Sequence, residues 1–264
     1  PRAFEDPSFA VTLPEIDLIM ETHISTINHI PLSCRDIVAD LFLVHLDRAS
    51  SNPSFFNFHV VFLIPKLILF TPTQKGKNHR RDLKSYITER VRRFFAAEYM
   101  SLWQEAQSNQ KKLNQANEKQ KTTSTQFTGI TLPQTSNIKR AEKFTRLGQY
   151  SKAIKALDSH GIAEDTDATF ETLKSKHPSM PPPTLPQEPC PESLSFTTDQ
   201  VNAAVRSFFT DTAPGPSGLK ANYLKDSLSA PNANKRSRFL LSLTQFVNNL
   251  NEAKIPNDFG PYLF

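Results

Sequence analysis

The sequence predicts a mainly α-helical protein, made of small helical modules joined by flexible and proline-rich linkers. Three observations support this prediction. Apolar residues recur at steps of three and four in several stretches, as they do along one face of a helix. Polar and proline-rich segments separate these stretches, with seven prolines over 178–191 alone. Hydrophobic residues make up 38% of the 264 residues, which is low for one large core.

Charge and cysteine content set the first limits on function. The net charge is +5 and the pI about 9.2, which is compatible with a polyanionic partner. Cys34 and Cys190 lie far apart and form neither a metal-ligand pattern nor a disulfide framework. No Cys-x-x-Cys or His-x-x-x-His pair is present, so we expect no metal site. From the cysteine content we expect a reducing intracellular location, in the nucleus or the cytoplasm. The absence of a signal-peptide pattern agrees with this expectation.

Residues 1–30 are predicted to be extended or disordered, because three prolines interrupt them and their polar residues follow no period. A helical region is expected over 31–107. Its first helix has Ser33 as candidate N-cap and ends at Asn52-Pro53.

The most apolar stretch of the chain covers residues 55–70. It has 16 residues, whereas a membrane span needs about 20, and polar residues interrupt it. We therefore expect a core helix broken at Pro65 and followed by a short strand over 67–70, and no membrane insertion.

A long basic amphipathic helix is predicted from about residue 81 to residue 107. Residues 75–121 carry 12 Lys and Arg against 5 Asp and Glu, so the local charge is +7. Such cations can follow nucleic-acid phosphates and make binding depend on salt. The candidates are Arg90, Arg92 and Arg93. The alternative is a solvated helix face.

Three further segments complete the middle of the chain. Residues 108–137 are too polar to bury much surface and are predicted to be a flexible linker. An alternative for the start of this stretch is a frayed continuation of the preceding helix. Residues 138–177 are predicted to be a three-helix module, with Phe170 and Leu173 facing inward. It is a small packed unit or, alternatively, a protein-docking surface. Residues 178–194 are expected to form a semi-rigid proline-rich spacer.

Residues 195–264 contain a predicted helix, a stiff turn and two further helices. Thr197 and Gln200 have capping-box spacing at the start of the first helix. Four apolar residues of this helix are expected to face inward: Val201, Val205, Phe208 and Phe209.

The turn reads Ala-Pro-Gly-Pro-Ser-Gly-Leu over residues 213–219. Pro214 and Pro216 fix φ, and Gly215 and Gly218 permit positive φ or a close backbone approach. One interpretation is a phosphate site at the following helix N-terminus, with two nearby lysines as candidate ligands: Lys220 and Lys225. The alternative, which we favour, is a structural turn that orients two helices.

These residues support a resemblance to a known family. A helix that begins Phe-Thr-x-x-x-Val, the turn at 213–219 and the pair Leu224-Lys225 resemble the N-terminal fingers region of retrotransposon reverse transcriptases. Ser217 stands where those proteins commonly have Asp. Upstream parts are similar to retroelement polyproteins, at Ile64-Pro65-Lys66, at Leu102-Trp103 and over 140–178. The resemblance covers about two-thirds of the chain.

The resemblance implies that residues 195–264 are the incomplete N-terminal part of an α/β RNA-directed DNA polymerase. Such polymerases hold two metal ions on carboxylates, and no Tyr-x-Asp-Asp segment or adjacent Asp pair is present. We therefore expect a truncated polyprotein that is inactive alone, with no catalytic residue and no cofactor, Mg²⁺ being expected only for the complete polymerase. Its expected partners are element RNA or DNA and the remainder of the polymerase. The second hypothesis is a helical protein–protein interaction module without nucleic-acid function.

Overall fold

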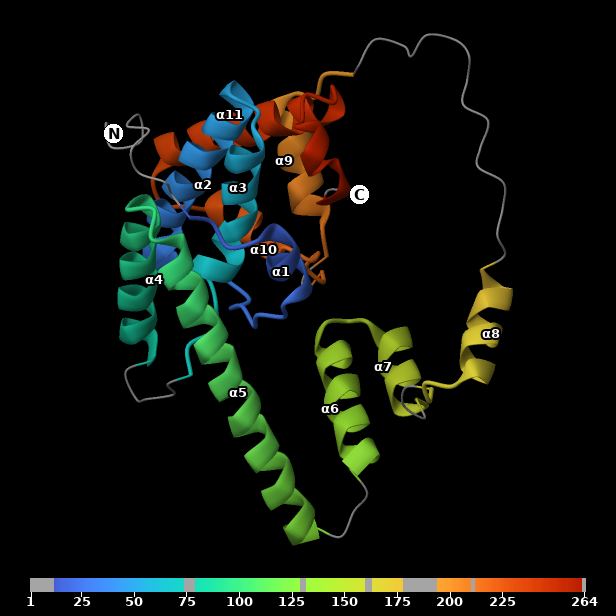
Figure 1. Ribbon diagram of the computed structural model, residues 1–264. Helices are drawn as coiled ribbons and strands as arrows, with labels where there is room; N and C mark the ends of the chain where they lie inside the picture. Colours follow the sequence, from blue (N-terminus) through green and yellow to red (C-terminus); the bar gives the residue numbers. More distant parts are fainter. Residues whose placement is uncertain are drawn as a thin grey trace. The chain divides into compact units, whose positions relative to one another are not determined.

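The computed structural model describes residues 12–73, 79–128, 132–159, 163–177, 194–209 and 212–262. The chain, drawn as a ribbon in Figure 1, divides into two units. Each unit has its own hydrophobic cluster. The first unit combines Pro1–Ala116 with Glu192–Phe264, and the second is Asn117–Pro191. Among the described residues there is no strand, and one isolated antiparallel bridge joins Thr26 to Phe70. The prediction of a mainly α-helical protein is confirmed.

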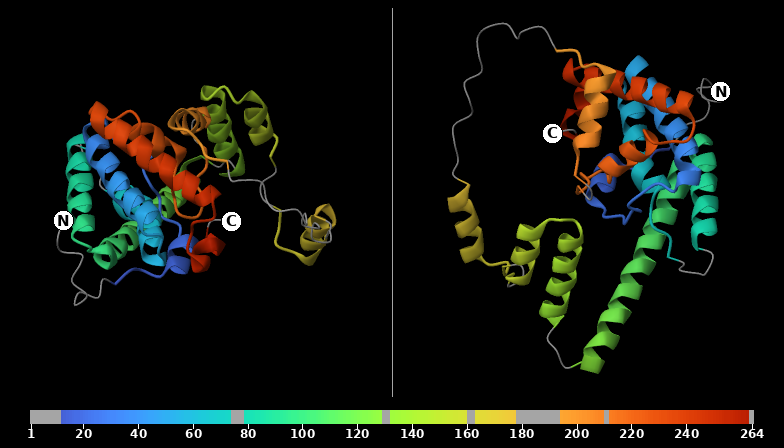
Figure 2. Two further views of the ribbon diagram at one scale, coloured as in Figure 1. Left: turned by 90° about the horizontal axis from the view of Figure 1, so that it is seen from above. Right: turned by 180° about the vertical axis from the view of Figure 1, so that it is seen from behind.

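The first unit is assembled from the two ends of the chain. Its N-terminal part contains α1 (Ile16–Glu21), η1 (Leu32–Cys34), α2 (Arg35–Ser51), α3 (Phe55–Ile68), α4 (His79–Phe95) and the first part of α5 (Tyr99–Thr128). Its C-terminal part contains α9 (Thr198–Ser207), α10 (Ala221–Ser227), α11 (Ala233–Asn251) and η2 (Asn257–Tyr262). Helix α11 packs along α2, while η2 contacts α3 (Figure 2). Segments about 200 residues apart in sequence therefore share one core.

Helix α3 lies at the centre of this core. Its residues from Phe58 to Ile68 are buried except for Phe62, because α2, α4 and η2 all contact it. The predicted break at Pro65 is wrong, and so is the strand over 67–70. Pro65 falls in the last turn of the helix, where the lost hydrogen bond is offset by packing, and the Leu69 N–H still bonds to the Pro65 carbonyl at 3.1 Å. No helix in the described part of the chain is both long and apolar enough to cross a membrane.

The predicted helix over 81–107 is two helices, α4 and α5. Ala97 has φ 59° and ends α4 in a left-handed cap. Its N–H bonds to Phe94, and the next N–H, of Glu98, bonds to Arg93, which is the pattern of a Schellman motif. Glycine is the usual residue at this position, so the sequence contained no stop signal here.

Residues 12–30 are also structured, contrary to the prediction of an extended segment. Four isoleucines, Ile16, Ile19, Ile24 and Ile30, are buried in the first core. They lie on the short helix α1 and its flanking loops, which no helical period reveals. Ser33 is not the N-cap of α2: Cys34 holds that position without a side-chain bond, because η1 leads directly into the helix.

The C-terminal segment packs on helices of this chain, not on strands. Thr197 and Gln200 form the predicted capping box, and Val201 and Val205 are buried as expected. Phe208 and Phe209 are not buried; Phe209 is 81% exposed. Helix α9 ends at Ser207 and the next residue, Phe208, is already extended, so the helical period no longer applies there.

The second unit contains a helical hairpin and a separate helix. Helices α6 (Leu132–Arg146) and α7 (Tyr150–Leu157) pack against each other, and α8 (Asp167–Lys176) buries no residue. The predicted three-helix module is therefore wrong in its third member. The linker predicted over 108–137 is also wrong where it is described: α5 runs to Thr128 because its Gln, Lys and Ala residues favour helix and extend one already formed. The proline-rich spacer lies outside the described residues, apart from its last residue.

Candidate functional site

The turn over residues 213–219 is held by its own backbone and by α3. The Gly218 N–H donates to the Gly215 carbonyl at 2.9 Å, which places Pro216 and Ser217 at the two centres of a β-turn. The Ser217 hydroxyl is buried and accepts from the Leu219 N–H at 3.3 Å. Ser217 thus fills a local structural role.

Gly218 is the one position in this turn that requires glycine. Its φ is +79°, and a Cβ there would meet Lys66 Cγ at 3.3 Å. Gly215 has ordinary φ and open space around it. The two glycines therefore differ: Gly218 permits a left-handed turn against α3, while Gly215 does not need to be glycine for steric reasons.

A cleft of about 660 Å³ borders the turn. Its walls are the end of α1 with the loop after it and, opposite, Pro214, Gly215, Pro216 and Gly218. Lys66 also lines the cleft and is buried. The Lys66 ammonium donates to the carbonyl of Thr22 at 2.8 Å and to that of Ile19. Burial lowers the pKa of Lys66 to about 8.

Lys220, a predicted phosphate ligand, is turned toward the protein. Its ammonium donates to the carbonyls of Thr26 and Ile27 at 2.9 and 3.0 Å, and to Asn28 Oδ1 at 3.0 Å. The Tyr223 hydroxyl also donates to the Ile27 carbonyl. Lys220 therefore ties the end of the turn to the loop after α1, and these bonds would have to break before it could hold a phosphate.

Lys225, the other lysine candidate, caps the end of α9. Its ammonium donates to the carbonyl of Phe208, the residue that follows the helix. A lysine at this point is favourable because the last carbonyls of a helix lack partners.

Asp226 is an anchor that the sequence reasoning missed. This buried carboxylate accepts from the Ile30 N–H at 2.8 Å and pairs with Arg35 at 2.6 Å. His29 Nδ1 lies 3.3 Å from the same carboxylate. Two further bonds join the same regions, from Asn232 N–H to Asp36 and from Lys235 to Asp40. The turn and its following helices are therefore fixed to the N-terminal part of the unit.

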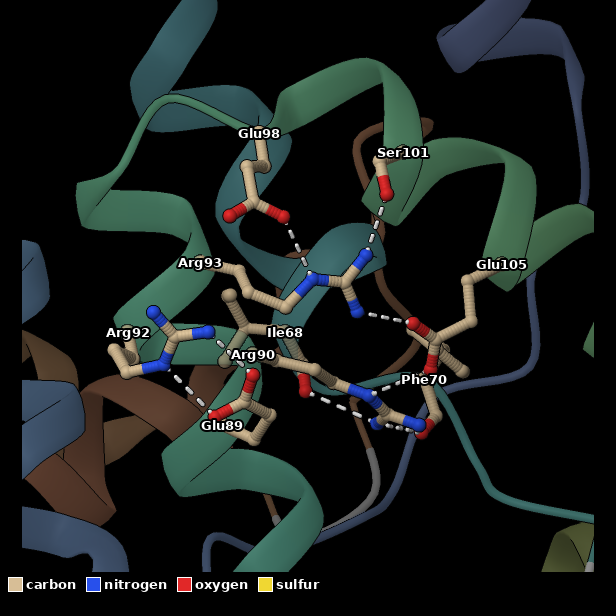
Figure 3. A network of polar contacts seen from close by, with 9 residues as sticks. All are labelled: Ile68, Phe70, Glu89, Arg90, Arg92, Arg93, Glu98, Ser101 and Glu105. Carbon is tan, nitrogen blue, oxygen red and sulfur yellow. Dashed lines mark hydrogen bonds and ion pairs between the residues drawn. The ribbon is translucent and has the colours of Figure 1, made fainter.

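Arg90, the first of the three arginine candidates, is buried (Figure 3). Its side chain is 3% exposed, donates to the Phe70 carbonyl at 3.0 Å and lies over the Phe70 ring at 3.3 Å. Glu105 lies 3.6 Å away, and burial lowers the pKa of Arg90 to about 10. Arg90 therefore joins α4 to the end of α3 and is closed to a phosphate.

The other two arginines differ in exposure. Arg93 pairs with Glu98 at 3.1 Å and Glu105 at 2.6 Å, so it joins α4 to α5 (Figure 3). Arg92 pairs with Glu89 on its own helix, and its side chain is 65% exposed. Among the three, Arg92 alone has a guanidinium open to solvent.

The second unit also carries exposed positive charge. Leu132–Ser159 carries six Lys and Arg against two Asp and Glu, a net charge of +4. Three of these cations, Lys139, Lys143 and Arg146, follow one another at steps of four and three on one face of α6, and all are exposed. The sequence count over 75–121 directed attention away from this helix.

Comparison with known proteins adds no relative. No protein-family model matches the chain, and no curated protein or solved structure matches it.

Proposed function

We propose that the chain is the part of a retroelement polyprotein that precedes and enters a reverse transcriptase, and that its first unit supports the N-terminal part of the polymerase fingers. It works inside the cell and has no catalysis of its own. The observation that carries the proposal is the anchoring of the turn segment: Lys220 and Asp226 bind backbone groups of residues 26–30. The upstream helices and the segment with the family motif thus belong to one core.

This arrangement suits a supporting role. A motif segment that lacked its own core would need a platform, and here α2 and α3 supply it. The polar contacts that fix the turn would hold it at a constant angle to that platform. The remainder of the polymerase is the proposed partner of this unit.

Nucleic-acid binding is the second part of the proposal. Because Arg90, Lys220 and Lys225 are engaged within the first unit, the proposed contacts fall to exposed cations: Arg92 and the α6 stripe, Lys139, Lys143 and Arg146. The element RNA or its DNA copy is the proposed ligand. Phosphate contacts of this kind release counterions, so the affinity should fall steeply with salt.

The supporting role is tested by separating the two parts of the first unit. Residues 1–116 and 192–264 are produced as two chains in one cell and purified through a tag on one of them. We expect the two to co-purify and to unfold in one cooperative transition. Recovery of the tagged part alone would overturn the supporting role.

RNA binding is tested with the full chain and a single-stranded RNA of random sequence at 50 and 200 mM salt. The charge-reversal variant Lys139→Glu/Lys143→Glu/Arg146→Glu should weaken binding at least tenfold. The matched control Lys174→Glu/Lys176→Glu, on α8, should weaken it much less. Absence of binding by the unaltered chain at low salt would rule out the nucleic-acid role.

A helical interaction protein is the second candidate function. It is favoured by an apolar groove of about 290 Å³ between α9, α10 and α11, whose lining is apolar except for Gln200. This alternative requires no RNA affinity, so the same titration separates the two candidates.

A further inference from the structure

The α6–α7 hairpin has a very small core. Its buried residues are three alanines, Ala141, Ala153 and Ala156, with Phe144 partly buried beside them. Short helices gain most of their stability from the packing of an apolar face. A core of this size leaves the hairpin in need of a further packing partner.

Helix α7 has a stripe of apolar side chains that is exposed to solvent. Tyr150, Ile154 and Leu157 lie at steps of four and three, so they share one face of the helix. All three are exposed, with Ile154 at 68%. Ile138, in the middle of α6, is exposed as well, and a bond from Asn137 to the Ser159 carbonyl brings this part of α6 close to the residues that follow α7. Exposed apolar side chains gathered in this way mark an interaction surface.

Helix α8 has a similar pair of apolar side chains, and these are exposed as well. Phe170 and Leu173 lie three residues apart, and Phe170 is 61% exposed. Thr166 caps the helix through the Thr169 N–H, so α8 has a defined beginning. The ion pair between Lys174 and Glu171 at 3.7 Å is internal to the helix.

The two surfaces have opposite charge. The hairpin, Leu132–Ser159, has a net charge of +4, whereas the described segment that contains α8, residues 163–177, has four acidic and two basic residues and a net charge of −2. Its acidic residues, Glu164, Asp165, Asp167 and Glu171, lie before α8 and in its first turns, and its basic residues, Lys174 and Lys176, lie in the last turn. Two hairpins would repel each other, while a hairpin and the acidic beginning of this segment attract, and complementary charge of this kind selects partners and orientation.

We propose that α8 of one copy packs on the α6–α7 hairpin of a second copy, in a reciprocal exchange that forms a dimer. Phe170 and Leu173 of each copy cover Ile154 and Leu157 of the other. In a single copy α8 leaves the α7 stripe exposed, and exchange of an identical element between protomers is a low-cost route to a two-fold dimer. Each copy then completes a three-helix unit with a helix from its partner. This inference does not depend on the polymerase assignment.

The test measures the mass of the full chain by sedimentation equilibrium from 1 to 100 μM. The unaltered chain should be a dimer. Ile154→Asp on the hairpin and Phe170→Asp on α8 should each weaken dimerisation at least tenfold. An equimolar mixture of the two variants should regain dimers, because an intact α8 from one meets an intact hairpin from the other. Leu241→Asp, an exposed position on α11, is the matched control and should leave the mass unchanged.

A cross-linking experiment shows whether α8 of a second copy covers the apolar stripe of α7. Ile154→Cys/Phe170→Cys in a chain with Cys190→Ser, oxidised with glutathione disulfide, should give a covalent dimer on a non-reducing gel. A monomer that cross-links within one chain would mean that α8 closes on its own hairpin and would overturn the proposal. A monomer with no cross-link would leave the patch to a different protein and would overturn it as well.

Discussion

Both units contain helices with apolar residues at helical spacing, but the two units bury these residues to very different extents. In the first, α2, α3, α4 and α11 enclose a core of large side chains, with Trp103, Phe58 and Tyr223 nearly inaccessible. In the second, the core is three alanines, and the large apolar residues of α7 and α8 face solvent. A helical period thus predicts a helix and its apolar face. It does not predict whether another element covers that face.

The cations divide in the same way. In the first unit, the side chains of Arg90, Lys66 and Lys220 donate hydrogen bonds to backbone carbonyl groups of other segments and so join elements of the fold. In the second, the side chains of Lys139, Lys143 and Arg146 on α6 are exposed, and Arg146 lies 3.8 Å from Glu142 on the same helix. The net charge of a stretch of sequence therefore shows which segments are basic. It does not show which of their charged side chains are exposed to solvent.

The largest expected effect comes from removing a ring at the centre of the first core. Phe58 packs against Phe246 and Phe259, so it joins the two ends of the chain. Phe58→Ala should cost about 3–5 kcal/mol of unfolding free energy through the cavity that it leaves. Urea unfolding followed by Trp103 fluorescence measures it, because the single Trp lies in this unit. Phe209→Ala, at an exposed site, should cost less than about 0.5 kcal/mol, and equal losses would show that the Phe58 ring contributes no more to the core than an exposed ring does.

Acid should destabilise the first unit through two buried histidines. Burial lowers the pKa of His45 to about 3 and that of His59 to about 4. Both values lie below the unfolded value near 6.5, so the unfolded chain binds more protons as the pH falls below 6.5. Stability present at pH 7 is therefore lost in acid, by about 2 kcal/mol per histidine at pH 5.

The measurement is the urea midpoint of the Trp103 signal at pH 7 and pH 5. His59→Leu should remove about half of the acid sensitivity that His45 and His59 contribute, and His23→Gln, at an exposed position, is the matched control. An acid sensitivity unchanged by His59→Leu would exclude this buried imidazole as a source. No titratable side chain is buried among the described residues of the second unit, so this comparison concerns the first unit alone.

The two turn glycines should respond in opposite ways. Gly218→Ala forces a left-handed residue against Lys66 and should cost about 1–2 kcal/mol. Gly215→Ala meets no atom within 4 Å and has ordinary φ, so it should be neutral or stabilise by up to about 1 kcal/mol. Equal effects in thermal unfolding of the two variants would show that the turn is not held against α3.

The smallest effect concerns two helix caps of the same type. Thr197→Ala removes the capping box of α9 and should lower the stability of the first unit by about 1 kcal/mol. Thr166→Ala removes the cap of α8, which buries nothing, so it should reduce far-ultraviolet helical signal without moving the Trp103 transition. A shift of that transition by Thr166→Ala would mean that α8 packs on the first unit.

Much of the fold could be predicted from periodicity and caps, and the errors have identifiable causes. Helices α2, α9 and α11 and the capping box follow from local patterns. The end of α4 could not be predicted in this way, because Ala97 has a positive φ, a conformation that glycine usually adopts. The buried isoleucines before residue 31 could not be predicted, because residues buried on loops do not recur at a regular spacing in the sequence.

The candidate site was harder to predict because it depends on contacts between distant segments. One signal was present: Arg90 lies between Ile87, Val91 and Phe94 on the apolar face of α4, which indicates burial and not phosphate binding. Asp226 offered no such signal, since its partners Ile30 and Arg35 are nearly 200 residues away. The structural role of the turn stays a prediction, which its internal Gly218–Gly215 bond supports.

The assembly of one core from both ends of the chain has a consequence for biosynthesis. Helix α3 leaves the ribosome about 190 residues before η2 does, so at roughly 5–20 residues per second it waits on the order of 10–40 s for this C-terminal contact. During that interval the part of α3 that η2 later covers is open to chaperones and to aggregation. Slow codons or stalling within the intervening second unit would lengthen that exposure. The yield of folded protein should therefore depend on translation speed through a segment that is not itself part of the core.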